Sequence, residues 1–173
     1  QKTAYEISTR DWSSDVCSSD LKNQSNLTGT RIFAEELHLD NPSIAQKTAT
    51  EIFKTHDDLT DLVNNAAYAY GSLFSLTPIS ELEKVYNVNF FSNIAITQVA
   101  AKKFRKNCGG SITNITSMSS RIPARGMLAY GSSKSSLEYA TRIIAEELSP
   151  YGIKVNAVAP GLLDTDMRNQ MDP

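Results

Sequence analysis

The sequence has few cysteines, no long apolar run and no excess of one charge, and each absence excludes a class of protein. Its 173 residues include two cysteines, Cys17 and Cys108, which are too few for the disulfide framework of a small secreted protein. No run of about eighteen apolar residues occurs, so we expect no membrane span. The formal net charge is −2, and no basic patch suggests nucleic acid or an anionic membrane surface as a partner.

Residues 1–21 differ from the rest of the chain. They show no apolar periodicity, and QKTAYEI and DWSSDVCSSDL back-translate into strings that resemble a sequencing-library adapter. We therefore interpret residues 1–21 as a non-native, disordered segment; a disordered native tail is the alternative. Residues 22–173 are then a partial single domain with fifteen basic and fifteen acidic residues. Its lone Cys108 fits a reducing compartment, and we expect a cytoplasmic protein.

Strand-like and helix-like patterns alternate along residues 36–159. Such alternation predicts an α/β fold with a doubly wound parallel sheet, truncated at both ends. A Pro at the first turn marks the start of two of the helices. We expect strands near 36–40, 59–64, 111–116 and 154–159, and helices over 42–54, 79–104 and 128–148.

The best candidate site is a tyrosine and a lysine four residues apart in the last helix. Tyr130 and Lys134 would share one helix face, so the ammonium can lie beside the phenol. A fixed positive charge lowers the pKa of a phenol from about 10, which makes it a usable general acid or base. Ser117, on the preceding loop, is placed to bond the same substrate oxygen. By itself the Tyr and Lys spacing is a weak signal, because surface helices carry such pairs by chance.

Other polar or turn residues fall at the ends of the predicted strands. Ligands of open parallel sheets bind outside the carboxyl ends of the strands. We therefore expect these residues to lie together at that edge of the sheet: Asp40, Asn64, Ser117 and Pro160–Gly161.

Together these residues resemble the short-chain dehydrogenases/reductases, which are nicotinamide-dependent oxidoreductases with a Rossmann fold. Asn64-Asn65-Ala66-Ala67 is similar to the Asn-Asn-Ala-Gly element of that family, and Tyr130-x-x-x-Lys134 matches its active-site signature. Ser117 has the expected spacing, Asn89 falls where a fourth catalytic residue is expected, and Pro160–Thr165 resembles the turn that holds the nicotinamide. Most similar is the 3-oxoacyl-acyl-carrier-protein reductase group.

The resemblance implies roles for these residues with NAD or NADP as cofactor. Tyr130 would protonate the carbonyl oxygen that accepts hydride, Ser117 would polarise it, and Lys134 would bind the nicotinamide ribose and lower the phenol pKa. Asn89 would hold a water that joins Lys134 to solvent. The implied cofactor contacts are Asp40, Asn64, Ala66, Tyr130, Lys134, Pro160, Gly161, Leu163 and Thr165.

Purely structural interpretations stay open for several of these residues. Ser117 has Ser119 and Ser120 as rivals, Asn89 fits a helix polar residue bonded to a carbonyl, and Asp40 fits a helix anchor. His38 and His56 match no ligand motif, so no metal site is predicted.

Two features limit the expected activity. Ala67 replaces the usual Gly and would be strained at a positive φ. The Gly-rich phosphate loop has no counterpart, so we expect the fragment to bind cofactor poorly and to be inactive.

The intact parent is expected to act on a small carbonyl or alcohol, with a carrier-bound acyl group as one candidate, and to form a homotetramer or homodimer. Its long helices at 80–104 and 128–148 would pair, with Leu137 and Ile143 as candidate contacts, although both also fit a face turned to the sheet. The alternatives are an epimerase or dehydratase of the same family and a non-catalytic nucleotide-sensing protein.

Overall fold

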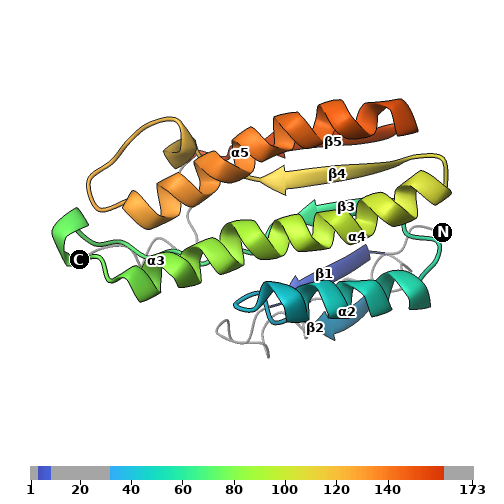
Figure 1. Ribbon diagram of the computed structural model, residues 1–173, viewed down its shortest axis with the longest axis horizontal. Coiled ribbons are helices and arrows are strands. Elements are labelled where there is room, and N and C mark those ends of the chain that lie inside the picture. The colour runs from blue at the N-terminus through green and yellow to red at the C-terminus, as the bar shows by residue number, and fades with distance from the viewer. Residues whose placement is uncertain (1–3, 9–31, 162–173) are drawn as a thin grey trace.

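The chain alternates strands and helices in a computed structural model that describes residues 4–8 and 32–161 (Figure 1). None of the described helices is long and apolar enough to cross a bilayer. The strands are β1 (Ala4–Ser8), β2 (Ile32–Glu36), β3 (Asp61–Asn64), β4 (Gly110–Ile115) and β5 (Ile153–Val158). The α-helices are α2 (Pro42–Thr55), α3 (Ile79–Tyr86), α4 (Ser92–Lys106) and α5 (Leu128–Leu148). The shorter elements are η1 (Phe74–Leu76), η2 (Asn87–Phe91), η3 (Met118–Ser120) and η4 (Ser149–Tyr151).

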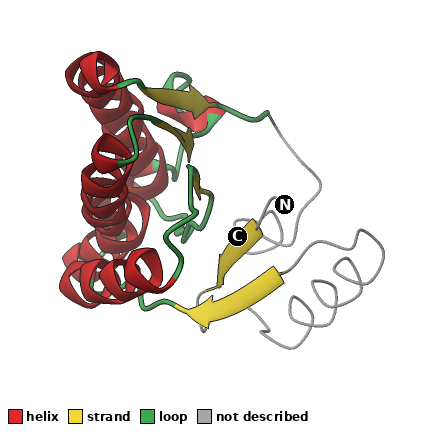
Figure 2. Ribbon diagram, turned by 90° about the vertical axis from the view of Figure 1, so that its right-hand side faces the viewer, coloured by secondary structure: helices red, strands yellow, loops and turns green. Residues whose placement is uncertain are grey.

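All described strand pairs are parallel, as the sequence predicts. Strands β3, β4 and β5 form one sheet in that order, and β1 pairs with β2 in another. Asn64 of β3 lies opposite Asn114 of β4, and Ile112 lies opposite Val155 of β5. Figure 2 shows the described helices gathered on one face of the strands. This arrangement confirms the expected parallel α/β architecture.

The beginning of the chain differs from expectation. We expected residues 1–21 to be disordered, but Ala4–Ser8 forms β1, paired in parallel with β2 from Ala4 opposite Ile32. The segment contains Tyr5 and Ile7, which are residue types common in strands. Residues 9–21 lie outside the described part, and a non-native origin of the segment stays a prediction.

The strand expected at 36–40 lies earlier in the chain, at Ile32–Glu36. Leu37 and Leu39, whose alternation suggested that strand, are both buried in the core cluster, although they belong to no strand. A segment whose side chains are buried at every second position has the same sequence pattern as a half-buried strand, even where it forms no hydrogen bonds with a neighbouring strand. The pattern therefore identified the core residues correctly and placed the strand wrongly.

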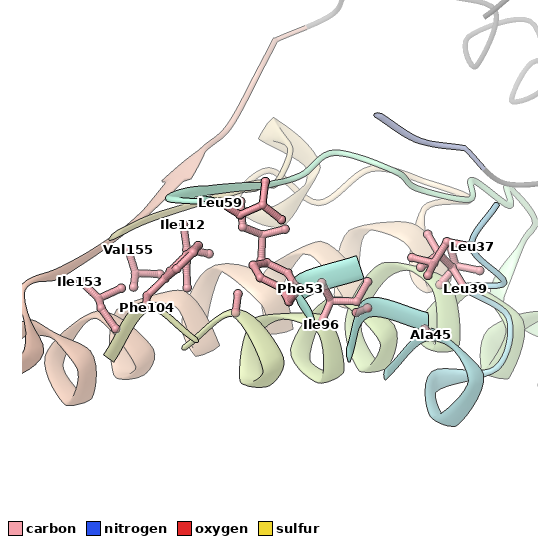
Figure 3. Packing of buried hydrophobic residues seen from close by; sticks show 14 residues of the cluster. Leu37, Leu39, Ala45, Phe53, Leu59, Ile96, Phe104, Ile112, Ile153 and Val155 are labelled. Carbon is pink, nitrogen blue, oxygen red and sulfur yellow. The ribbon is translucent and has the colours of Figure 1, made fainter. Parts of the chain in front are cut away.

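The main hydrophobic core lies between the helix layer and the strands (Figure 3). The rings of Phe53 and Phe104 meet edge to face with centroids 5.9 Å apart. A Cβ atom at Gly110 would lie 2.5 Å from the Phe104 ring, so only glycine fits at the start of β4. The phenylalanine pair thus joins α2 and α4 to the central strand.

The long helix expected over 79–104 contains a π-turn. Helix α3 runs into η2, a π-helix over Asn87–Phe91, and continues as α4. The Asn93 side chain donates to the backbone carbonyl of Asn89, within the turn, at 2.8 Å. On either side of this turn, α3 packs on α5 and α4 packs on α2.

Candidate active site

Tyr130 and Lys134 lie on one face of α5, as their spacing predicts. Lys134 is only 1% exposed and Tyr130 8% exposed. The Lys134 ammonium donates to the Ile115 carbonyl at the end of β4 over 2.7 Å and lies 5.9 Å from the centre of the Tyr130 ring. The interior of the protein thus holds a cation next to a phenol at the carboxyl end of a parallel strand.

Ser117 brings a hydroxyl to the same place. It follows β4 and caps η3, where its Oγ accepts a hydrogen bond from the Ser119 backbone at 3.2 Å. A hydrogen-bonding interaction of its side chain with the Tyr130 phenol lowers the pKa of that phenol. The structure therefore brings Ser117, Tyr130 and Lys134 together at the carboxyl end of β4, whereas the Ser120 hydroxyl is bonded to the Ser117 carbonyl and to Glu138.

The pKa directions correct one expectation. Burial raises the pKa of Tyr130 above its ordinary value, and the hydrogen bond with Ser117 acts in the opposite direction without outweighing it. We expected Lys134 to lower that pKa, but its own burial lowers the pKa of Lys134 to about 8 instead. The Tyr130 phenol is therefore protonated at neutral pH, the form that a general acid needs.

Asn89 lies in η2 and connects three segments. Its Oδ1 accepts from the Tyr68 backbone N–H at 2.8 Å, and its Nδ2 donates to the Tyr68 carbonyl at 2.9 Å and to Ser133 Oγ at 3.0 Å. Ser133 directly precedes Lys134 and donates to the Tyr130 carbonyl at 2.7 Å. The fully buried Asn89 amide thus fixes the loop after β3 to the helix that carries the tyrosine and the lysine.

Asn64 ends β3, but its side chain points inward. Its Nδ2 donates to Thr97 Oγ1 at 3.0 Å and to Asn114 Oδ1 at 2.8 Å, and Asn114 donates to Thr141 at 2.9 Å. The side chain is therefore occupied by a buried polar network under the site rather than turned toward the strand-end edge. Alternation from the buried Leu62 is the signal that would have indicated this inward direction.

Most other expected cofactor residues lie at or near the same edge. Asp40 is exposed, and the neighbouring Asn41 caps α2 in its place. Pro160 accepts from the Met118 backbone at 3.2 Å, which places the Pro160–Gly161 turn beside η3. Ala66 is half-buried against the core. Leu163 and Thr165 lie outside the described residues.

The expected strain at Ala67 is absent. Among the described residues only Cys108, at φ 59°, has a positive φ without being glycine. Ala67 therefore occupies an ordinary backbone conformation, and the missing glycine costs nothing there.

Four buried polar residues around the site were not predicted. Two of the four had a signal in the sequence, because Asn114 pairs with Asn64 across the strands and Ser133 lies one helical turn after Tyr130 on α5. All four are buried. They are Thr97, Asn114, Ser133 and Thr141.

Known proteins resemble this chain along nearly all of its length. The sequence profile of the short chain dehydrogenases matches residues 4–173. The chain is 33% identical over 142 residues to a 3-oxoacyl-acyl-carrier-protein reductase of Aquifex aeolicus, covering 82% of this chain and 57% of that protein. It is 36% identical over 107 residues to carbonyl reductase (NADPH) 2 of Sus scrofa, covering 61% and 44%.

Among solved structures, the acetoin dehydrogenase YohF of Salmonella typhimurium superposes with a TM-score of 0.83 at 28% identity, covering 94% of this chain and 65% of that one. The chain spans about half the length of the curated relatives it matches. With its profile, its parallel α/β fold and its Ser, Tyr and Lys cluster in agreement, the chain belongs to the short-chain dehydrogenase family.

Proposed function

We propose that the parent protein is an NAD(P)-dependent oxidoreductase that interconverts a ketone and a secondary alcohol. The observation that carries the proposal is the cluster of the Ser117 hydroxyl, the Tyr130 phenol and the buried Lys134 ammonium at the carboxyl ends of parallel strands. The names of the relatives, a 3-oxoacyl reductase and a carbonyl reductase, support the same reaction class.

The residues present fit a nicotinamide cofactor at this edge. Lys134 has three N–H donors, and among the described residues one bond is accounted for, to Ile115. A buried ammonium with spare donors suits a ribose diol. We assign Lys134, Asp40, Ala66 and the Pro160–Gly161 turn to cofactor binding, and by resemblance Leu163 and Thr165. We leave Asn64 in the supporting network. When bound, the cofactor supplies or accepts the hydride.

Tyr130 acts as the proton donor in the reductive direction. Because burial keeps the phenol protonated, it can deliver a proton to the substrate oxygen as negative charge develops there. Ser117 bonds the same oxygen and orients it. Asn89 keeps α5 in register with the loop after β3. In the oxidative direction Tyr130 is the base.

The proposed substrate is a small carbonyl compound of the 3-oxoacyl type. Support comes from the relative in Aquifex aeolicus, whose name states this chemistry. Whether the acyl group arrives on a carrier protein or as a free thioester is decided by comparing kcat/KM for both forms.

The decisive experiment replaces the phenol hydroxyl in the parent polypeptide of full family length. Oxidation of NADPH or NADH is followed by absorbance with an acetoacetyl thioester and with a simple diketone. We expect Tyr130→Phe to lower kcat by about 10²–10⁴-fold, the usual contribution of general acid catalysis. Tyr139→Phe on the same helix is the matched control, because Tyr139 is 66% exposed.

Equal losses in both variants, or none in either, would contradict the proposal. Cofactor consumed in proportion to product indicates net reduction, whereas product formed without net consumption indicates an epimerase or dehydratase. The 173-residue chain is assayed in parallel, and we expect it to be inactive.

We also propose that the parent pairs with copies of itself through α5 and the preceding long helix. Leu128, Tyr139 and Ile143 of α5 and Phe91 of η2 are exposed apolar or aromatic residues suited to such burial, whereas Leu137, an expected contact, is buried inside the protomer. Mass measurement of Ile143→Glu in solution tests the pairing.

The free, exposed Cys108 suits the cytoplasm, where we place the protein.

A further inference from the structure

Helix α5 carries two neighbouring rows of residues, and only one of them has been used so far. Tyr130 and Lys134 belong to the first. The second row consists of Gly131, Ser135 and Glu138, which follow at the spacing of one helical face. All three contact the segment Met118–Arg121, which directly follows Ser117.

The first two members of the second row touch the backbone of η3. A Cβ atom at position 131 would lie 3.0 Å from the Ser119 carbonyl oxygen, so the helix approaches η3 closely where it has a glycine. Four residues on, the Ser135 hydroxyl lies 2.7 Å from the Ser120 carbonyl oxygen. The two contacts fix the height of η3 along the helix.

Glu138 completes the row with a charge. Its side chain is 6% exposed, and its Oε2 accepts from the Ser120 hydroxyl. Its Oε1 accepts from Arg121 Nε at 2.9 Å and Nη2 at 2.7 Å, and from Arg142 Nη2 at 2.8 Å. These hydrogen bonds, with those of Arg121 and Ser120 foremost, lower the pKa of Glu138 to about 2. The carboxylate is therefore charged throughout the physiological range.

Ser120 links this carboxylate to the catalytic serine. Its Oγ lies 2.7 Å from the Ser117 carbonyl oxygen as well as beside Glu138, so one hydroxyl hydrogen is placed between two acceptors. The carboxylate thus reaches the backbone of Ser117 through a single side chain. Arg142 differs, because it pairs with Glu138 from within α5 itself.

We propose that Glu138 is a positioning residue that holds η3 against α5 and thereby keeps the Ser117 hydroxyl within hydrogen-bonding reach of Tyr130. Its effect on turnover rests on the function proposed above, but its effect on the Ser117–Tyr130 hydrogen bond does not. A merely structural Glu138 would stabilise the fold without affecting that bond.

The first test reads the Ser117–Tyr130 contact directly, in the 173-residue chain, without any assay of turnover. The Ser117 hydrogen bond lowers the pKa of Tyr130, so losing that bond should raise it. The tyrosine rings are ¹³C-labelled, the Tyr130 resonance is assigned with Tyr130→Phe, and its titration is followed by NMR. Ser117→Ala defines the titration that results when the bond is absent.

We expect Glu138→Leu and Ser120→Ala to move the Tyr130 titration upward toward that of Ser117→Ala, and Arg142→Ala to leave it in place. The double variant Ser117→Ala with Glu138→Leu should titrate no higher than Ser117→Ala alone. Ser120→Ala keeps the ion pairs between Glu138 and the two arginines. It therefore tests the link to Ser117 even if Glu138→Leu does not fold. An unchanged titration in Ser120→Ala beside a raised one in Ser117→Ala would overturn the proposal.

The second test measures turnover in the parent of full family length. Ser120→Ala should lower kcat by about tenfold or more, because a small displacement of a substrate-orienting group is costly, and should change the cofactor KM less than about twofold. A KM effect without a kcat effect would contradict the positioning role. If the parent shows no reductase activity, the proposed function fails and the NMR test still decides the role of Glu138.

Discussion

Burial of the Lys134 charge predicts an unusual dependence of stability on pH. The ammonium is 1% exposed, and burial lowers its pKa from 10.5 to about 8. Between these values the unfolded chain binds the proton that the folded chain has released. The free energy of unfolding therefore rises as the pH increases from 8 to 10.5. This contribution is fully present above pH 10.5 and is lost as the pH drops to 8. Below pH 8 both states are protonated and the slope vanishes.

The size of the effect follows from the width of the window. A difference of about 2.5 pH units corresponds to roughly 3 kcal/mol of unfolding free energy. Lys134→Met keeps most of the side-chain volume and removes the titration. It also leaves the Ile115 carbonyl without its donor, at a cost of about 1–3 kcal/mol that does not depend on pH.

Urea denaturation at intervals from pH 6.5 to 10.5 measures both proteins. We expect the stability of wild type relative to Lys134→Met to be flat up to about pH 8 and then to rise by roughly 3 kcal/mol. Subtracting the variant cancels most of the titration of other groups. Lys102→Met, at an exposed position of α4, is the matched control and should give a flat difference. Parallel curves for wild type and Lys134→Met between pH 8 and 10.5 would refute the assigned burial.

Three further substitutions test other parts of the fold by urea denaturation at pH 7. Asn41→Ala removes the cap that accepts from Ser43 and Ile44 and should cost about 1 kcal/mol; no loss would mean that water replaces the cap. Asn114→Ala leaves Asn64 and Thr141 short of a partner and should cost about 3 kcal/mol. Cys108→Gly relieves a left-handed residue and should gain about 0.5–1 kcal/mol, with Cys108→Ala as the control that gains nothing.

The parts predicted well from the sequence are those where one local feature dominates. Pro42 fixed the start of α2, which begins at that residue. The spacing of Tyr130 and Lys134 sufficed to place both on one helical face, since the geometry of a helix leaves no other arrangement. The order of strands and helices was enough to predict a parallel sheet.

The parts predicted poorly depend on contacts between distant segments. The π-turn at Asn87–Phe91 adds a residue to a helix without altering its apolar spacing enough to be seen in the sequence. The raised pKa of Tyr130 results from burial by the whole fold, whereas the sequence shows only the neighbouring lysine. Likewise, the hydrogen bond from Asn64 to Asn114, fifty positions later, depends on how two strands pair.

Because the π-turn lies within a helix, the number of its residues determines where the side chains of the neighbouring helices point, whereas the length of a loop does not. Each residue of a helix advances the side-chain direction by about 100°, so removing one residue from η2 would turn α3 away from α5 or α4 away from α2. The Asn89 amide would leave the Tyr68 backbone with it. A single-codon deletion in this segment should therefore disrupt one of these helix contacts together with the Asn89 hydrogen bonds, whereas an insertion in the exposed turn at 57–58 should be tolerated.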